Sequence, residues 1–138
     1  MVTSKEQEAR DRFAGRYREE RVDVVQEIER RVIGAEWGAN GYTTIAQADG
    51  LADRLGLRAG DLLLDVGAGR GWPGLYLAAT TGCSVVLTDL PLEGLTVAAT
   101  RIQTEHLDAR AWCVNASARD LPFRAASFDA VVHTDVLC

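Results

Sequence analysis

The sequence predicts an α/β fold in which helices cover a parallel β-sheet of strand order 3-2-1-4. Short apolar runs rich in β-branched residues alternate with stretches of helical periodicity from residue 61 onward. The runs are almost continuously apolar, which is typical of parallel strands buried on both faces. Because crossovers between parallel strands are right-handed, four strands in this succession favour the order 3-2-1-4.

Residues 1–60 are predicted to form a helical cap region ahead of a half-domain at residues 61–138. Apolar residues recur at helical spacing in the first part, among charges of both signs. The apolar stripe consists of Val22, Val25, Ile28, Val32 and Ile33. We expect it to pack on the domain as an amphipathic helix that covers a sheet face or the mouth of a ligand site. Three glycines between Gly34 and Tyr42 predict a loop after it.

A second N-terminal helix is predicted between Thr44 and Gly56. Thr44 and Gln47 form a capping box, and Gly56 is a typical stop after a helix. The expected buried stripe consists of Ile45, Ala48, Leu51, Ala52 and Leu55. Trp37 and Tyr42 precede this helix, and we interpret them as packing residues; covering a bound cation with an aromatic face is the alternative.

The remaining elements alternate. Strands are predicted at Leu62–Asp65, Ser84–Asp89, Ala111–Val114 and Phe128–Leu137, and crossover helices at Pro73–Thr81 and Leu92–His106. The second crossover helix is expected to face inward with Leu92, Leu95, Ala99 and Ile102. Because the carboxyl ends of parallel strands meet at one edge, Asp65 and Asp89 should face one crevice, where such sheets bind ligands.

The glycine-rich loop after the first strand favours a cationic nucleoside over a dinucleotide. A dinucleotide-binding loop has a third glycine where this chain has Trp72, and Pro73 has no N–H to offer a pyrophosphate. The carboxylate of Asp65 would repel a pyrophosphate, whereas it can hold an ammonium group directly or through water. These features count against an NAD-dependent oxidoreductase.

Asp89 closes the second strand 24 residues after Asp65. This is close to the spacing of about 20 residues at which an acid binds a ribose diol in nucleotide-binding α/β units. Its two oxygens can accept hydrogen bonds from the 2′- and 3′-hydroxyls, and its charge disfavours a 2′-phosphate. Asp89 is therefore predicted to bind a ribose.

Three blocks of the sequence stand out: LLDVGAGRG at Leu63–Gly71, VVLTDLP at Val85–Pro91 and DLPFRAASFDAVVHTDVL at Asp120–Leu137. In this order and spacing they resemble the class I S-adenosylmethionine-dependent methyltransferases, in particular the broad type 11 group. The resemblance implies a Rossmann-like methyltransferase fold and S-adenosyl-L-methionine as the cofactor. The residues expected to bind the cofactor are Asp65, Gly67, Ala68, Gly69, Gly71, Asp89, Leu90, Ser117, Ala118 and His133.

Ser117 departs from the pattern of this family. An acidic residue that accepts a hydrogen bond from the adenine amino group commonly stands four positions before the Leu of LPF, and here that position is Ser117. A hydroxyl accepts such a bond without charge assistance, at about half the strength. Adenine recognition is therefore expected to be looser, or to use Asp120 and backbone groups as well.

The resemblance implies an enzyme that transfers a methyl group to an unidentified small-molecule acceptor. Holding the acceptor in line with the methyl group, away from water, can supply most of the rate of such a displacement. We therefore assign no catalytic base; His133 and Asp135 are the nearest candidates. A non-catalytic or truncated S-adenosylmethionine-binding module is the main alternative, and an NAD-dependent oxidoreductase is a weaker one.

The composition argues against several other classes of protein. A net charge of −5 at pH 7 is unfavourable for nonspecific binding to nucleic acid or an anionic membrane. No apolar stretch approaches the roughly 18 residues that span a bilayer, so we expect a cytoplasmic protein. The cysteines lack the close pairing of metal ligands and are interpreted as small hydrophobes, with no metal site predicted; they are Cys83, Cys113 and Cys138.

The chain stops at or just after the fourth predicted strand. Complete members of the family continue through further strands and helices that build most of the acceptor pocket, so we expect an N-terminal fragment. A fourth strand without a neighbour exposes an apolar edge, which favours self-association unless another segment covers it.

Overall fold

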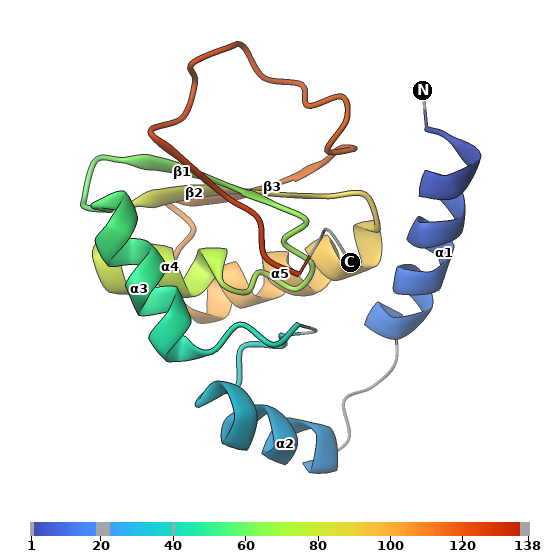
Figure 1. Cartoon of the computed structure of the whole chain (residues 1–138), viewed down its shortest axis with the longest axis horizontal. Coiled ribbons are helices and arrows are strands. Elements are labelled where there is room, and N and C mark those ends of the chain that lie inside the picture. The colour runs from blue at the N-terminus through green and yellow to red at the C-terminus, as the bar shows by residue number, and fades with distance from the viewer. Residues whose placement is uncertain (1, 19–22, 40, 136–138) are drawn as a thin grey trace.

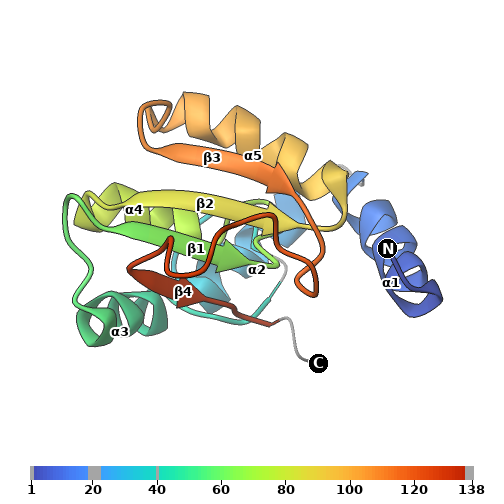
Figure 2. The same ribbon diagram turned by 90° about the horizontal axis from the view of Figure 1, so that it is seen from above.

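The computed structural model describes residues 2–18, 23–39 and 41–135. Its centre is a four-stranded parallel sheet, shown with the strands side by side in Figure 2. The strands are β1 Leu62–Val66, β2 Ser84–Asp89, β3 Ala111–Asn115 and β4 Ala130–Val132. Their order is β3-β2-β1-β4, with Leu64 opposite both Val86 and Val131. The predicted strand order is confirmed.

The crossover helices α4 (Gly74–Thr81) and α5 (Leu92–Thr104) lie on the same side of the sheet (Figure 1). Two successive right-handed crossovers in one direction place their helices on one face. The segment 116–129 arches over the opposite side. The expected helical cover on both faces is therefore not found in the described residues, and Trp112 and Val131 remain 46% and 53% exposed.

The core between the sheet and its helices is built from fully buried aliphatic side chains: Leu63, Leu75, Leu77, Val85 and Leu87. In α5 the buried face contains Leu95, Ala98 and Ile102. The predicted inward residues Leu92 and Ala99 are exposed instead, because the spacing 95, 98, 102 selects a slightly rotated face.

The helix α3 (Ile45–Leu55) agrees with its predicted ends. Thr44 and Gln47 form a capping box, and Gly56 adopts a left-handed conformation with φ of 61°. Ala48 is fully buried in the predicted stripe, whereas Leu55 at its end is 40% exposed.

Two separate helices, α1 (Ser4–Arg18) and α2 (Asp23–Ile33), precede α3, so three helices stand ahead of the sheet rather than the two expected. The apolar stripe predicted for α2 is confirmed only at Ile33, which is buried. Three of its other members, Val25, Ile28 and Val32, are exposed, and Val22 lies outside the described residues. The helix turns Glu29 and Ile33 inward. The Glu29 carboxylate accepts the N–H groups of Trp37 and Ala39 at 2.8 and 2.9 Å, and this anchors the following loop.

The fourth strand is shorter than predicted. It covers Ala130–Val132 rather than Phe128–Leu137, whose last residues lie outside the described part. Asp135 has φ of +56°, so the backbone is no longer extended at this residue, which lies within the predicted strand.

Two of the three cysteines lie in the described structure. Cys83 is buried and Cys113 is half-buried, and burial raises the pKa of both thiols. This confirms Cys83 as a small core residue. Of the helices that the structure describes, none is long and apolar enough to cross a membrane.

Candidate functional site

The glycine-rich loop, residues 67–71, leaves the carboxyl end of β1. Gly67, Gly69 and Gly71 have φ of 74°, 53° and 100°, which L-residues with side chains rarely adopt. The N–H groups of Gly67 and Ala68 donate to the Thr88 carbonyl at 2.8 and 3.0 Å. These bonds hold the loop across the ends of β1 and β2.

Asp65 lies behind this loop and is 1% exposed. Its carboxylate accepts the Gly74 N–H at 2.9 Å, at the first residue of α4. Burial, with a smaller contribution from the charge of Asp89, raises the pKa of Asp65 to about 7. The side chain thus holds the start of α4 against the loop.

Asp89 joins the end of β2 to the glycine-rich loop. One carboxylate oxygen accepts the Gly69 N–H at 2.7 Å, and the other accepts the Leu90 N–H at 2.8 Å. Burial raises the pKa of Asp89, and the two N–H donors oppose that rise. Each oxygen keeps acceptor capacity for one more hydrogen bond.

The main cavity opens beside Asp89 and has a volume of about 330 Å³. Its floor consists of strand ends and the residues that follow them: Val66, Gly67, Thr88, Asp89, Leu90, Pro91, Ala116, Ser117, Ala118 and Arg119. One face of α1 forms the opposite wall with Glu6, Ala9, Arg10, Arg12, Phe13 and Tyr17. In Figure 2, α1 lies beyond the carboxyl ends of the strands. The volume falls within the range of small-molecule sites.

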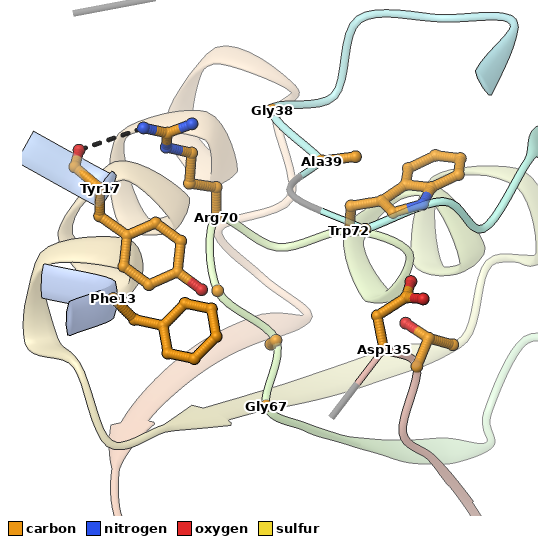
Figure 3. A pocket seen from close by; sticks show the side chains of 12 residues that line it. Phe13, Tyr17, Gly38, Ala39, Gly67, Arg70, Trp72 and Asp135 are labelled. Atoms are coloured by element: carbon orange, nitrogen blue, oxygen red, sulfur yellow. Dashed lines mark hydrogen bonds between the residues drawn. The ribbon is translucent and has the colours of Figure 1, made fainter. Parts of the chain in front are cut away.

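The helix α1 is attached at both ends. At its C-terminal end the Arg70 guanidinium donates to the carbonyls of Arg16 and Tyr17 at 3.0 and 3.2 Å, and the Arg70–Tyr17 contact is visible in Figure 3. At its N-terminal end the Glu6 carboxylate accepts a hydrogen bond from the Ser117 hydroxyl. Both contacts join α1 to segments that border the main cavity.

A second cavity of about 60 Å³ lies against the glycine-rich loop (Figure 3). It shares Phe13, Tyr17, Gly67 and Asp135 with the main cavity and is closed by Ala39 and Trp72 among others. These shared residues show that the two cavities meet at the loop.

Asp135 connects the end of β4 to the loop before α3. Its carboxylate accepts the Tyr42 N–H at 3.2 Å and the Thr43 hydroxyl at 3.1 Å. A Cβ atom at Gly41 would collide with the Asp135 carboxylate, so this approach requires glycine. The N-terminal segment is thereby fixed beside both cavities.

The structure brings together most, but not all, of the residues predicted for the site. Gly67, Asp89, Leu90, Ser117 and Ala118 line the main cavity, and Gly67, Ala68 and Gly69 line the second one. Asp65, Gly71 and His133 line neither of these cavities, and His133 is exposed beyond β4. Gly71 is instead required for packing, because a Cβ atom there would lie 2.5 Å from Leu75.

The contribution of α1 to the cavity is not predicted by the sequence. Glu6, Phe13 and Tyr17 line the main cavity, yet the bond from Ser117 to Glu6 spans 111 residues of sequence. No local spacing signals such a contact. Trp37 packs against Trp72 and Tyr76 with ring centroids 6.3 and 5.7 Å apart, which confirms its interpretation as a packing residue. Tyr42 is 81% exposed and does not pack as expected.

Comparisons with known proteins identify relatives of this chain. A family model described as a methyltransferase domain matches residues 64–138. The chain is 38% identical to methyltransferase GfsG of Streptomyces halstedii, over 59% of this chain and 29% of that protein. It is 35% identical to 27-O-demethylrifamycin SV methyltransferase of Amycolatopsis mediterranei, over 69% of this chain and 40% of that protein. The chain thus spans about a third of the length of these relatives.

A similar fold occurs in a solved structure. The SAM-dependent methyltransferase of Thiobacillus denitrificans, in complex with S-adenosyl-L-homocysteine, superposes with a TM-score of 0.63 at 19% identity. The match covers 78% of this chain and 43% of the other. At this level of identity the likeness concerns the fold.

Proposed function

The chain belongs to the S-adenosyl-L-methionine-dependent methyltransferase family, and we propose that its main cavity binds this cofactor for methyl transfer to a small-molecule acceptor. The observation that carries the proposal is Asp89, a half-buried carboxylate at the end of β2 that faces a cavity of about 330 Å³. Two ribose hydroxyls can donate to its oxygens, whose remaining bonds come from backbone N–H groups.

The carboxylates at the strand ends fit the charge of the cofactor locally. Asp89 and Asp135 lie on the side of the cavity formed by the strand ends, where a cationic group gains favourable electrostatic energy. The arginines of the lining, Arg10, Arg12 and Arg119, lie on α1 and in the segment after β3. Burial raises the pKa of Asp89. A positive charge of the ligand nearby would lower this pKa again and stabilise the ionised carboxylate. A 2′-phosphate on a ribose bound at Asp89 would meet that carboxylate with repulsion, which argues against NADP.

The proposed roles of this chain are binding, orientation and exclusion of water. When bound, S-adenosyl-L-methionine supplies an electrophilic methyl group on its sulfonium. Asp89 would hold the ribose, the loop at Gly67 and Gly69 would border the methionine part, and α1 with Phe13 and Tyr17 would shield the cavity from water. Asp65 would act as a positioning residue, because it fixes α4 and the loop from behind.

We assign no general base. Asp135 already accepts two hydrogen bonds from the loop before α3, and His133 lies outside both cavities. In-line placement of the acceptor can supply most of the rate without proton transfer, and a base is needed only if the acceptor must lose a proton. The acceptor is proposed to be a hydroxyl-bearing small molecule, since one relative is named as a methyltransferase of demethylrifamycin.

Calorimetric titration of the purified chain with S-adenosylhomocysteine tests the cofactor proposal. Asp89→Ala should weaken binding by about tenfold or more, because hydrogen bonds to a charged group contribute roughly 1.5–3 kcal/mol each. Asp89→Asn, which keeps the shape and one acceptor oxygen, should give an intermediate affinity. Asp53→Ala, an exposed substitution on α3, is the matched control and should leave the affinity unchanged.

Two results would contradict the proposal. The first is a folded chain that binds no S-adenosylhomocysteine, and the second is binding that is equally strong in the Asp89→Ala variant. A parallel titration with NADH should show no heat of binding. If binding is found, incubation with a labelled methyl donor and 27-O-demethylrifamycin SV, the compound in the name of one relative, separates a methyltransferase from a module that only binds the cofactor.

A further inference from the structure

We propose that Glu6 of α1 accepts a hydrogen bond from the adenine amino group and thereby makes the site select adenine. This inference deepens the proposed function and rests on it, because it concerns a nucleoside bound with its ribose at Asp89. The residue lies 111 positions before Ser117, its partner in the structure.

The lining residues give the main cavity two distinct ends. The residues that it shares with the second cavity, including Gly67 and Asp135, mark the end at the glycine-rich loop. Leu90, Pro91 and Ala116 line only the main cavity and mark its far end. The Asp89 carboxylate bonds to Gly69 of the glycine-rich loop and to Leu90 of the far end, so a ribose bound there has one substituent pointing to each end.

The chemistry of the two ends fixes the orientation of a cationic nucleoside. Asp135 gives the loop end a carboxylate, which suits the positively charged sulfonium and ammonium groups. The far end presents apolar walls from Leu90, Pro91 and Ala116, which suit the faces of a planar base. The base therefore belongs at the far end.

Glu6 is the carboxylate at that far end among the described lining residues. The other acids of the lining are Asp89, at the ribose position, and Asp135, at the loop end. Adenine presents an amino group that only donates, and a carboxylate only accepts. Ser117 also lines this end, but its hydroxyl proton is already directed to Glu6. A charged acceptor bonds about twice as strongly as a neutral one.

The position of the Glu6 carboxylate is fixed by three donors. One oxygen accepts the Thr3 N–H and the Thr3 hydroxyl, both at 2.8 Å, and the other accepts the Ser117 hydroxyl. These bonds lower the pKa of Glu6 to about 2, so the group is ionised at neutral pH. The oxygen that faces Ser117 retains acceptor capacity for an amino group.

The test compares two bases on the same ligand. Calorimetry would measure the affinity of the purified chain for S-adenosylhomocysteine and for S-inosylhomocysteine, in which a carbonyl replaces the amino group. The variants are Glu6→Gln and the matched control Glu8→Gln, an exposed residue of the same helix outside the cavity lining. Circular dichroism confirms that each variant is folded.

The unsubstituted chain should prefer the adenine ligand by about tenfold or more, the range expected for a hydrogen bond to a charged group. Glu6→Gln should lose most of this preference, because its amide can also donate to the carbonyl of the inosine ligand. Glu8→Gln should keep the preference. The inference would be overturned if Glu6→Gln left the ratio of the two affinities, for S-adenosylhomocysteine and for S-inosylhomocysteine, unchanged. It would also be overturned if Glu6→Gln weakened the binding of both ligands equally, since Glu6 would then only hold α1 in place.

The outcomes separate this inference from the cofactor proposal. If neither ligand binds the folded chain, the proposed function itself fails. If both ligands bind, with affinities that depend on Asp89 but not on Glu6, the cofactor proposal stands and adenine selection by Glu6 is refuted.

Discussion

The substitution Asp65→Asn should stabilise the chain at neutral and alkaline pH. The carboxyl group is 1% exposed and accepts one hydrogen bond, from the Gly74 N–H at 2.9 Å. Its pKa is about 7 in the folded chain, compared with 3.8 for an exposed aspartate. Asparagine keeps a carbonyl oxygen for the Gly74 N–H, and it never ionises.

The sign and size of the effect follow from these two pKa values. Between pH 3.8 and about 7 the folded chain binds more protons at Asp65 than the unfolded chain, so the free energy of unfolding falls as pH rises. Above about pH 7 this contribution is constant. At about 1.4 kcal/mol per pH unit, the total loss is roughly 4 kcal/mol.

Urea unfolding of the ligand-free chain at intervals from pH 4 to pH 8 measures this difference. The free energies of unfolding of the native chain and of Asp65→Asn should be closest near pH 4 and diverge by about 2–4 kcal/mol at pH 8. Asp53→Asn, at an exposed position of α3, controls for the loss of one charge. Parallel pH profiles of the native chain and Asp65→Asn would refute the reasoning.

Three further substitutions test contacts around the cavities. Gly69→Ala places a Cβ atom 2.6 Å from the Tyr17 hydroxyl at φ of +53°, so thermal unfolding should show a loss of about 1–3 kcal/mol, and adding Tyr17→Phe should restore part of it. Ser117→Asp puts a second carboxylate against Glu6, so calorimetry should show about tenfold weaker binding of S-adenosylhomocysteine, recovered by adding Glu6→Gln. Glu29→Ala leaves two backbone N–H groups without their acceptor, and urea unfolding should show a loss of about 2–4 kcal/mol. An unchanged midpoint, or binding of Ser117→Asp at full strength, would count against these contacts.

Local patterns in the sequence predicted the fold well. The strand order follows from the alternation of apolar runs and helices, and the capping box at Thr44 marks the start of α3 as the structure shows it. The helix α2 was predicted with the wrong face, because the pattern of Val25, Ile28 and Val32 gives the apolar side but cannot reveal a buried Glu29. Glu29 accepts backbone N–H groups of the following loop there, while Ile33 is the buried apolar residue of the helix.

The candidate site was only partly predictable. Asp89 and the glycine-rich loop follow strand ends, where the fold brings functional groups together, and both border the cavities. The spacing in the sequence could not distinguish Asp65, which points behind the loop, from Asp89, which points into the cavity. The wall formed by Glu6 and Tyr17 depends on contacts between segments that are distant in the sequence, and local sequence patterns do not predict such contacts.

The distance in sequence between the walls of the main cavity has a consequence for how the chain folds. Glu6 and Ser117 are 111 residues apart, and Tyr42 and Asp135 are 93 apart. Closing such long loops is entropically unfavourable until the intervening sheet has brought their ends close. We therefore expect the cavity to be completed late, when α1 packs onto a sheet that has already formed. A ligand that contacts both walls would link these two distant segments, and its binding free energy would stabilise their contact.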